Sequence, residues 1–225
     1  MKYGESAFDI LYLLFAVVSG AVILAKAKDR AGRLMGFAAL ILGCGDAFHL
    51  VPRVLYYFAD GDFTAALGIG KLITSVTMTL FYVLLYYVWL EYFRIPESKG
   101  TTAAVWSAAA VRIALCAFPQ NGWLENSSGM VWGIIRNVPF AALGALICCM
   151  YFKSRSKSRL FKPVWIYILL SFAFYLPVAV GAGAVPVLGM LMLPKTVCYI
   201  LLIATFLLAV LKHGGEKAVA AKEKE

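Results

Sequence analysis

The sequence predicts an all-α integral membrane protein, built as a bundle of seven transmembrane helices. Three observations lead to this fold class. Of the 225 residues, 62% are hydrophobic and only 15% are charged, whereas soluble domains carry about 25% charged residues. Seven apolar runs are long enough to cross a bilayer. Basic residues are concentrated in alternate connections between these runs, as the positive-inside rule requires of a multi-pass protein.

A helix crosses a bilayer with about 17 to 25 predominantly apolar residues. In chain order the predicted spans are 8–25, 34–58, 66–90, 102–118, 129–152, 163–181 and 186–211. The fourth span is the shortest and contains Arg112. The sixth and seventh spans are separated only by "AGAV" at 182–185, which predicts a tight helical hairpin. Short connections leave no room for a soluble domain, so residues 1–212 form one domain, followed by a flexible, polar cytoplasmic tail at 213–225.

The distribution of lysine and arginine predicts the orientation of the bundle. Basic residues follow the first, third, fifth and seventh spans, most densely in "KSRSKSRLFK" at 153–162, and the connections "ADGDFT", "PQNGWLENSS" and "AGAV" contain none. The N-terminus is therefore expected outside and the C-terminus in the cytoplasm, in a plasma or inner cell membrane. Anionic membrane lipids at the cytoplasmic rim account for the net charge of +9, so no nucleic-acid partner is predicted.

Basic side chains also occur inside the spans, on five different helices: Arg53, Lys71, Arg112, Arg136 and Lys195. Each lies about 5 to 10 residues from the nearest outer helix end, or roughly 8 to 15 Å at the helical rise per residue. A charged side chain at the centre of a membrane helix costs about 2.5 to 3.5 kcal/mol on insertion scales. We therefore expect the five cations to converge on an interior pocket open to the outside. Snorkelling to outer headgroups is the alternative for Arg53 and Lys71.

The second span carries a polar stripe. Asp46, His49, Arg53 and Tyr57 are spaced i, i+3, i+7 and i+11, which places them on one face of an α-helix. Asp46 is the deepest and lies near the bilayer midplane. Two structural readings stay open: Asp46 as an ion-pair partner for an arginine, and His49 as a hydrogen-bonded core histidine.

The predicted ligand-binding set combines this stripe with the other intramembrane polar groups. Its members are Asp46, His49, Arg53, Tyr57, Lys71, Arg112, Arg136, Asn137, Lys195 and Tyr199. Five cations are balanced at this depth by Asp46 alone, since Glu5 and Asp9 are expected near the outer mouth of the first helix. The excess positive charge predicts an anionic ligand that carries phosphate, carboxylate or sulfate, because a guanidinium pairs with two such oxygens at once.

Two functions are compatible with this cationic pocket. The first is a transporter or a sensor/receptor that binds an anionic small molecule or lipid headgroup, proton-linked through Asp46 and His49. The alternative is a membrane-embedded enzyme acting on a phosphate-bearing or other anionic lipid, with Asp46 and His49 as the catalytic acid–base pair. No nucleophile is identified beside them. The basic segment 153–162 is either a contact for a cytoplasmic protein partner or simply topology-determining charge.

No metal site and no cofactor are predicted. The five cysteines all fall inside spans without metal-ligand spacing, and the chain has only two histidines. A lysine in the last of seven helices is also found in retinal-binding rhodopsins, but the third span, "KLITSVTMTLFYVL", has no acidic counter-ion. The sequence therefore assigns no family.

Overall fold

The computed structural model describes residues 2–127, 129–181 and 185–222, and side chains within this part except those of residue 186 and residues 213–222. The described part contains seven α-helices, two short 3-10 helices and no strand. The α-helices are α1 (Lys2–Lys26), α2 (Arg30–Phe58), α3 (Thr64–Phe93), α4 (Lys99–Cys116), α5 (Met130–Lys153), α6 (Val164–Gly181) and α7 (Met192–Lys222); the 3-10 helices are η1 (Pro119–Asn121) and η2 (Pro186–Leu191).

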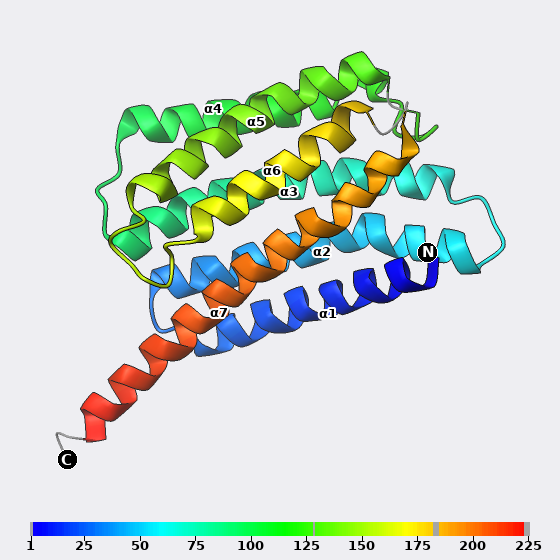
Figure 1. Ribbon diagram of the computed structural model, residues 1–225. Helices are drawn as coiled ribbons and strands as arrows, with labels where there is room; N and C mark the ends of the chain where they lie inside the picture. The colour runs from blue at the N-terminus through cyan, green and yellow to red at the C-terminus, as the bar shows by residue number, and fades with distance from the viewer. Residues whose placement is uncertain (1, 128, 182–184, 223–225) are drawn as a thin grey trace.

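The helices run up and down along a common direction (Figure 1). Each helix packs against the next in the chain, and α1 also packs against α7. Two further contacts cross the bundle, one between α3 and α5 and the other between α2 and α7. One end of the bundle holds the N-terminus and the α2–α3 connection, and the other holds the connections rich in basic residues (Figure 1). We call these the outer and inner ends, after the orientation predicted from charge.

The predicted seven-helix membrane bundle is confirmed at the level of fold class. Six of the described helices are long and apolar enough to span a bilayer, and α4 is the exception. Its composition explains this, because alanines replace larger aliphatic residues along much of α4 and Arg112 lies within it. Packing of α4 against α3 and α5 buries Arg112 in spite of this low hydropathy.

Helix ends differ from the predicted spans mainly at the two termini of the chain. α1 begins at Lys2 rather than at residue 8, so the first polar turn of the chain is helical. The start of the seventh span, 186–191, is a 3-10 helix, and α7 continues past residue 211 to Lys222. Residues 182–184 of the predicted hairpin and residues 223–225 of the predicted tail lie outside the described residues.

Two glycines bring α2 and α3 into close contact beside the polar stripe of α2. A Cβ atom added to Gly70 would lie 2.1 Å from the backbone oxygen of Phe48, and one added to Gly45 would lie 2.1 Å from Thr77 Oγ1. No side chain fits at such distances, so glycine permits the backbones to approach. This approach sets the end of α3 directly against the α2 turns that carry Asp46 and His49.

Candidate functional site

A small cavity of about 40 Å³ lies in the outer half of the bundle, between α1, α2, α3 and α7. We call it the outer cavity. Its polar lining comprises Glu5 and Asp9 of α1, Asp46, His49 and Arg53 of α2, Thr74 of α3, and Lys195 and Thr196 of α7. A cavity of this size holds a few water molecules or one small anion. It is far below the roughly 300 to 1,000 Å³ of ordinary small-molecule sites.

The stripe on α2 faces this cavity, as its spacing predicts. Asp46, His49 and Arg53 all line it. Arg53 forms an ion pair with Glu5 of α1, and the hydroxyl of Tyr57 donates a hydrogen bond to the other carboxylate oxygen of Glu5 at 3.3 Å. Because the side chains of Arg53 and Glu5 remain 25% and 21% exposed, this pair forms the mouth of the cavity.

Asp46 and Lys195 occupy the deeper part of the outer cavity. Tyr12 of α1 donates a hydrogen bond to Asp46 Oδ2 at 2.7 Å. Lys195 is only 6% exposed, and its ammonium lies over the rings of Tyr175 and Tyr199, 4.9 and 5.3 Å from their centres. Asp46 and Lys195 attract each other electrostatically, but no direct ion pair joins them among the described residues.

Two buried polar atoms of the cavity lining have no hydrogen-bond partner within the described part of the chain. They are Asp9 Oδ2 and His49 Nδ1, and Asp9 is only 5% exposed. Buried polar groups are nearly always hydrogen-bonded, so these atoms mark where a ligand, a proton or water completes the site. No described hydrogen bond connects His49 to Asp46, which binds Tyr12 instead.

The outer cavity has a mixed charge and differs in this from the cationic pocket that the sequence predicts. Its lining carries three carboxylates against the cations Arg53 and Lys195. The difference arises on α1, where Glu5, Asp9 and Tyr12 follow one another at i, i+4 and i+7 and so share a face. That face is turned toward α2, which brings two additional carboxylates inside. The same spacing rule, applied to α1, identifies these residues from sequence.

The other three intramembrane cations lie outside the outer cavity and are each held by an asparagine. The pairs are Lys71 Nζ with Asn126 Oδ1 at 2.7 Å, Arg112 Nη1 with Asn137 Oδ1 at 2.8 Å, and Arg136 Nη1 with Asn121 Oδ1 at 2.7 Å. Lys71 is exposed, whereas Arg112 is 1% exposed and its guanidinium lies 3.7 Å from the ring centre of Phe140. Neutral amide oxygens thus replace the carboxylates that a buried cation usually requires.

Asn137 and Tyr175 connect these cations to the outer cavity. Asn137 Oδ1 accepts a hydrogen bond from Arg112 and a second one, at 2.8 Å, from the hydroxyl of Tyr175, whose ring lies under Lys195. Arg112 and Lys195 also repel each other electrostatically. Tyr199, predicted as a ligand-binding residue, is buried below Lys195 and packs edge-on against Phe81.

The predicted residues are therefore gathered in one half of the bundle but not around one cavity. Lys71 lies near enough to both Arg53 and Arg136 for electrostatic repulsion, so the cations form a chain of neighbours across the outer half. Of the five, Arg53 and Lys195 line the outer cavity in the part of the chain that the structure describes. The sequence pattern does not single out Asn121 and Asn126, because uncharged polar residues in a connection carry no distinctive signal. It does not single out Tyr175 either, because a tyrosine within an apolar helix such as α6 reads as an ordinary core residue.

Comparisons with known protein families, with curated proteins and with solved structures gave no match for this chain. The helices themselves identify a multi-pass, membrane-type helical protein. Its function is argued below from the geometry of the outer cavity.

Proposed function

We propose that this chain is a proton-linked membrane transporter or sensor that binds a small anion in the outer cavity. The observation that carries the proposal is the pair of buried, unpartnered atoms, Asp9 Oδ2 and His49 Nδ1, in the same cavity as Asp46 and Lys195. Ionisable groups inside a membrane bundle are expensive to bury and characteristically mark ion pathways and proton relays.

A change of charge in the cavity lining links proton uptake to anion binding. With all carboxylates ionised, Glu5, Asp9 and Asp46 outnumber the cations Arg53 and Lys195, and an anion is repelled. Protonation of Asp9 and Asp46 reverses this balance and leaves Lys195 without a counter-charge. The cavity then attracts an anion, and by thermodynamic linkage a bound anion favours protonation to the same extent.

The size of the cavity selects the class of ligand. About 40 Å³ is sufficient for chloride, formate or acetate and too small for a phospholipid headgroup. Of the two ligand classes predicted from sequence, the small anion is therefore the one we propose for this cavity.

No specific contact favours the alternative of an embedded enzyme. Thr74 and Thr196 are the hydroxyl-bearing residues of the described lining, and their hydroxyls donate to the backbone oxygens of Gly45 and Met192, both at 3.0 Å. Neither hydroxyl is hydrogen-bonded to His49 in the described structure, so no base is positioned to activate it.

Binding of small anions to the purified protein in nanodiscs tests the proposal. Formate and chloride should raise the melting temperature at acidic pH more than at neutral pH, and the bulky anion gluconate should not. Asp46→Asn imitates the protonated carboxylate, so this variant should bind formate at neutral pH. Lys195→Met should abolish binding at both pH values. Asp60→Asn, in the exposed outer connection, is the matched control and should behave as wild type.

The two variants are expected to act in opposite directions, which separates the proposal from a purely structural role. Weaker formate binding in Asp46→Asn, or unchanged binding in folded Lys195→Met, would overturn it. Uptake of labelled chloride into proteoliposomes under an imposed pH gradient, above that of protein-free liposomes, then distinguishes transport from sensing: uptake identifies a transporter, and binding without uptake favours a sensor.

A further inference from the structure

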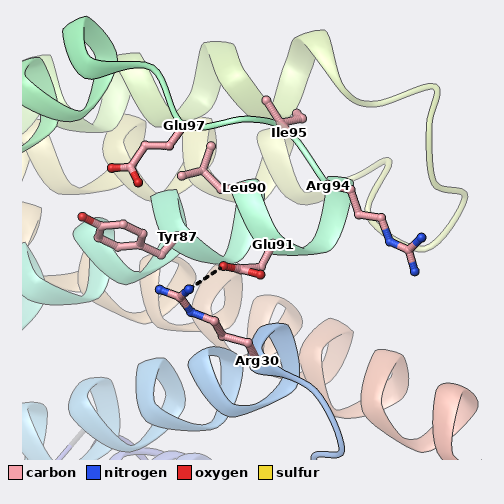
Figure 2. Close-up of a pocket in the computed structure, with 7 residues that line it drawn as sticks. All are labelled: Arg30, Tyr87, Leu90, Glu91, Arg94, Ile95 and Glu97. Carbon is pink, nitrogen blue, oxygen red and sulfur yellow. Dashed lines mark ion pairs between the residues drawn. The ribbon is translucent and has the colours of Figure 1, made fainter.

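A second, larger hollow lies at the inner end of the bundle and is unrelated to the outer cavity. It has a volume of about 290 Å³, close to the lower limit for small-molecule sites. We call it the inner groove. Its walls include Arg30, Tyr87, Leu90, Glu91, Arg94 and Glu97 (Figure 2).

The turn that ends α3 builds this groove. Arg94 adopts a left-handed backbone conformation with φ of 52°, and the next amide, Ile95 N, donates to Leu90 O at 2.9 Å. This helix end, of the type that usually carries glycine, brings the chain back over the last turns of α3. As a result Glu97 lies on the same side of the groove as Tyr87, whereas the Arg94 side chain points away from the other residues (Figure 2).

The groove carries both signs of charge in fixed positions. Glu91 Oε1 pairs with Arg30 Nη1 at 3.2 Å, and Glu97 Oε1 accepts a hydrogen bond from the hydroxyl of Thr102 at 2.8 Å. Each carboxylate has a second oxygen for a ligand. The ring of Tyr87 is held in place because its hydroxyl accepts a hydrogen bond from the Trp106 indole at 2.9 Å.

This combination matches a zwitterionic ligand with an ammonium and a phosphate. Carboxylates and the face of an aromatic ring bind an ammonium, and arginine binds phosphate. The groove lies at the end of the bundle where charge predicts the cytoplasmic headgroup layer, and Tyr87 and Trp106 are the aromatic types enriched at that level. Arg30, whose side chain is 68% exposed, is accessible to that layer.

We infer that the inner groove binds the headgroup of a phospholipid with a free primary ammonium, of the ethanolamine class. The ammonium lies between Glu91 and Glu97 against the ring of Tyr87, and the phosphate contacts Arg30. A choline headgroup cannot donate hydrogen bonds to the carboxylates, and a glycerol headgroup has no ammonium. The site therefore discriminates between lipids that share the same acyl chains.

Lipid exchange in nanodiscs, read by native mass spectrometry, tests this assignment. Phosphatidylethanolamine should be retained over phosphatidylcholine and phosphatidylglycerol with the same chains. Glu97→Gln keeps the oxygen that accepts from Thr102 but removes the charge, and it should weaken retention of the ethanolamine lipid about tenfold, the effect expected for one hydrogen bond to a charged group. Glu91→Gln should act in the same direction. Glu125→Gln, an exposed glutamate at the outer end, is the control.

The result depends on which of the three lipids the protein retains and on whether the two glutamate variants change that preference. Preference for the ethanolamine lipid that is lost in Glu91→Gln and Glu97→Gln, but kept in Glu125→Gln, supports the assignment. Equal retention of the choline lipid, or stronger retention of the glycerol lipid, would overturn it, because the carboxylates would then have no role in recognition. A cooperative thermal unfolding transition in each variant verifies that it is folded.

Discussion

Replacing Arg112 with methionine tests how a fully buried guanidinium is accommodated between α4 and α5. Arg112 is 1% exposed, donates to Asn137 Oδ1 at 2.8 Å and, more weakly, to the backbone oxygen of Arg136 at 3.3 Å. Its guanidinium lies over Phe140, and its Nε is buried without a hydrogen-bond partner among the described residues. Methionine keeps a similar length and loses these polar contacts.

The stabilisation from the polar contacts of Arg112 and the cost of burying its charge nearly cancel. The expected change in the free energy of unfolding is therefore small. One good hydrogen bond from a charged group contributes about 1.5 to 3 kcal/mol, and a desolvated cation–π contact contributes about 2 kcal/mol. Removing the charge recovers about 2.5 to 3.5 kcal/mol of burial cost. We therefore expect Arg112→Met to lower the free energy of unfolding by about 1 to 2 kcal/mol.

A double-mutant cycle with Phe140→Leu isolates the ring contact. Reversible unfolding in mixed detergent micelles gives the stability of the wild type, the two single variants and the double variant. The coupling energy between positions 112 and 140 should be about 2 kcal/mol, within the usual range for residues in contact. A coupling below about 0.5 kcal/mol, or a stability gain in Arg112→Met, would show that the packing on Phe140 does not offset the burial of charge.

Three further changes have defined outcomes. Gly70→Ala should destabilise the bundle by more than about 2 kcal/mol in the same unfolding assay, since its Cβ would meet a backbone oxygen at 2.1 Å. Tyr12→Phe removes the donor to Asp46 and should cost about 1.5 to 3 kcal/mol in that assay. The pKa of the Asp62 carboxyl in the outer connection is lowered by hydrogen bonds from the hydroxyl and backbone N–H of Thr64. Thr64→Val should raise this pKa toward 3.8, as followed by carbon NMR titration.

A control glycine substitution and the pH dependence of stability complete these tests. Gly100→Ala, in the first turn of α4 with nothing within 4 Å of the added Cβ, should change the free energy of unfolding by less than about 0.5 kcal/mol. A loss equal to that of Gly70→Ala would contradict the close-approach argument. The pKa of Asp62 is lower in the folded state. Its ionised carboxylate therefore adds to the free energy of unfolding at neutral pH, and this stabilisation is lost as the pH falls through the folded-state pKa. If the pKa of Asp62 is unchanged in Thr64→Val, the Thr64 hydroxyl is not a cause of the lowered pKa.

The fold follows from the sequence because lipid imposes a strong pattern. Long apolar runs and alternating basic connections fix the helices and their order, and the structure confirms the seven-helix class. The first turn of α1 lies outside the predicted span because Lys2 and Glu5 precede the apolar run. Glu5 forms an ion pair with Arg53 of α2, and a search for apolar runs does not detect contacts of that kind.

The sequence predicts only part of the arrangement of these side chains, and the reason is equally physical. The α2 stripe was identified because i, i+3 and i+7 spacing fixes a common face regardless of neighbours. Which of the other helices turns its cation into the outer cavity depends on rotation about each helix axis. In a membrane helix both the lipid-facing and the packed face are apolar, so the sequence pattern does not set that rotation. Lys195 is buried and Lys71 remains exposed.

The limited hydropathy of α4 bears on how the protein enters the membrane during synthesis. Arg112 has its main hydrogen-bond acceptor, Asn137, on the following helix, which a ribosome completes only later. When α4 is synthesised, its guanidinium therefore lacks this acceptor, and α4 is not among the described helices that are long and apolar enough to span a bilayer alone. We expect α4 and α5 to enter the bilayer together, as a helical hairpin.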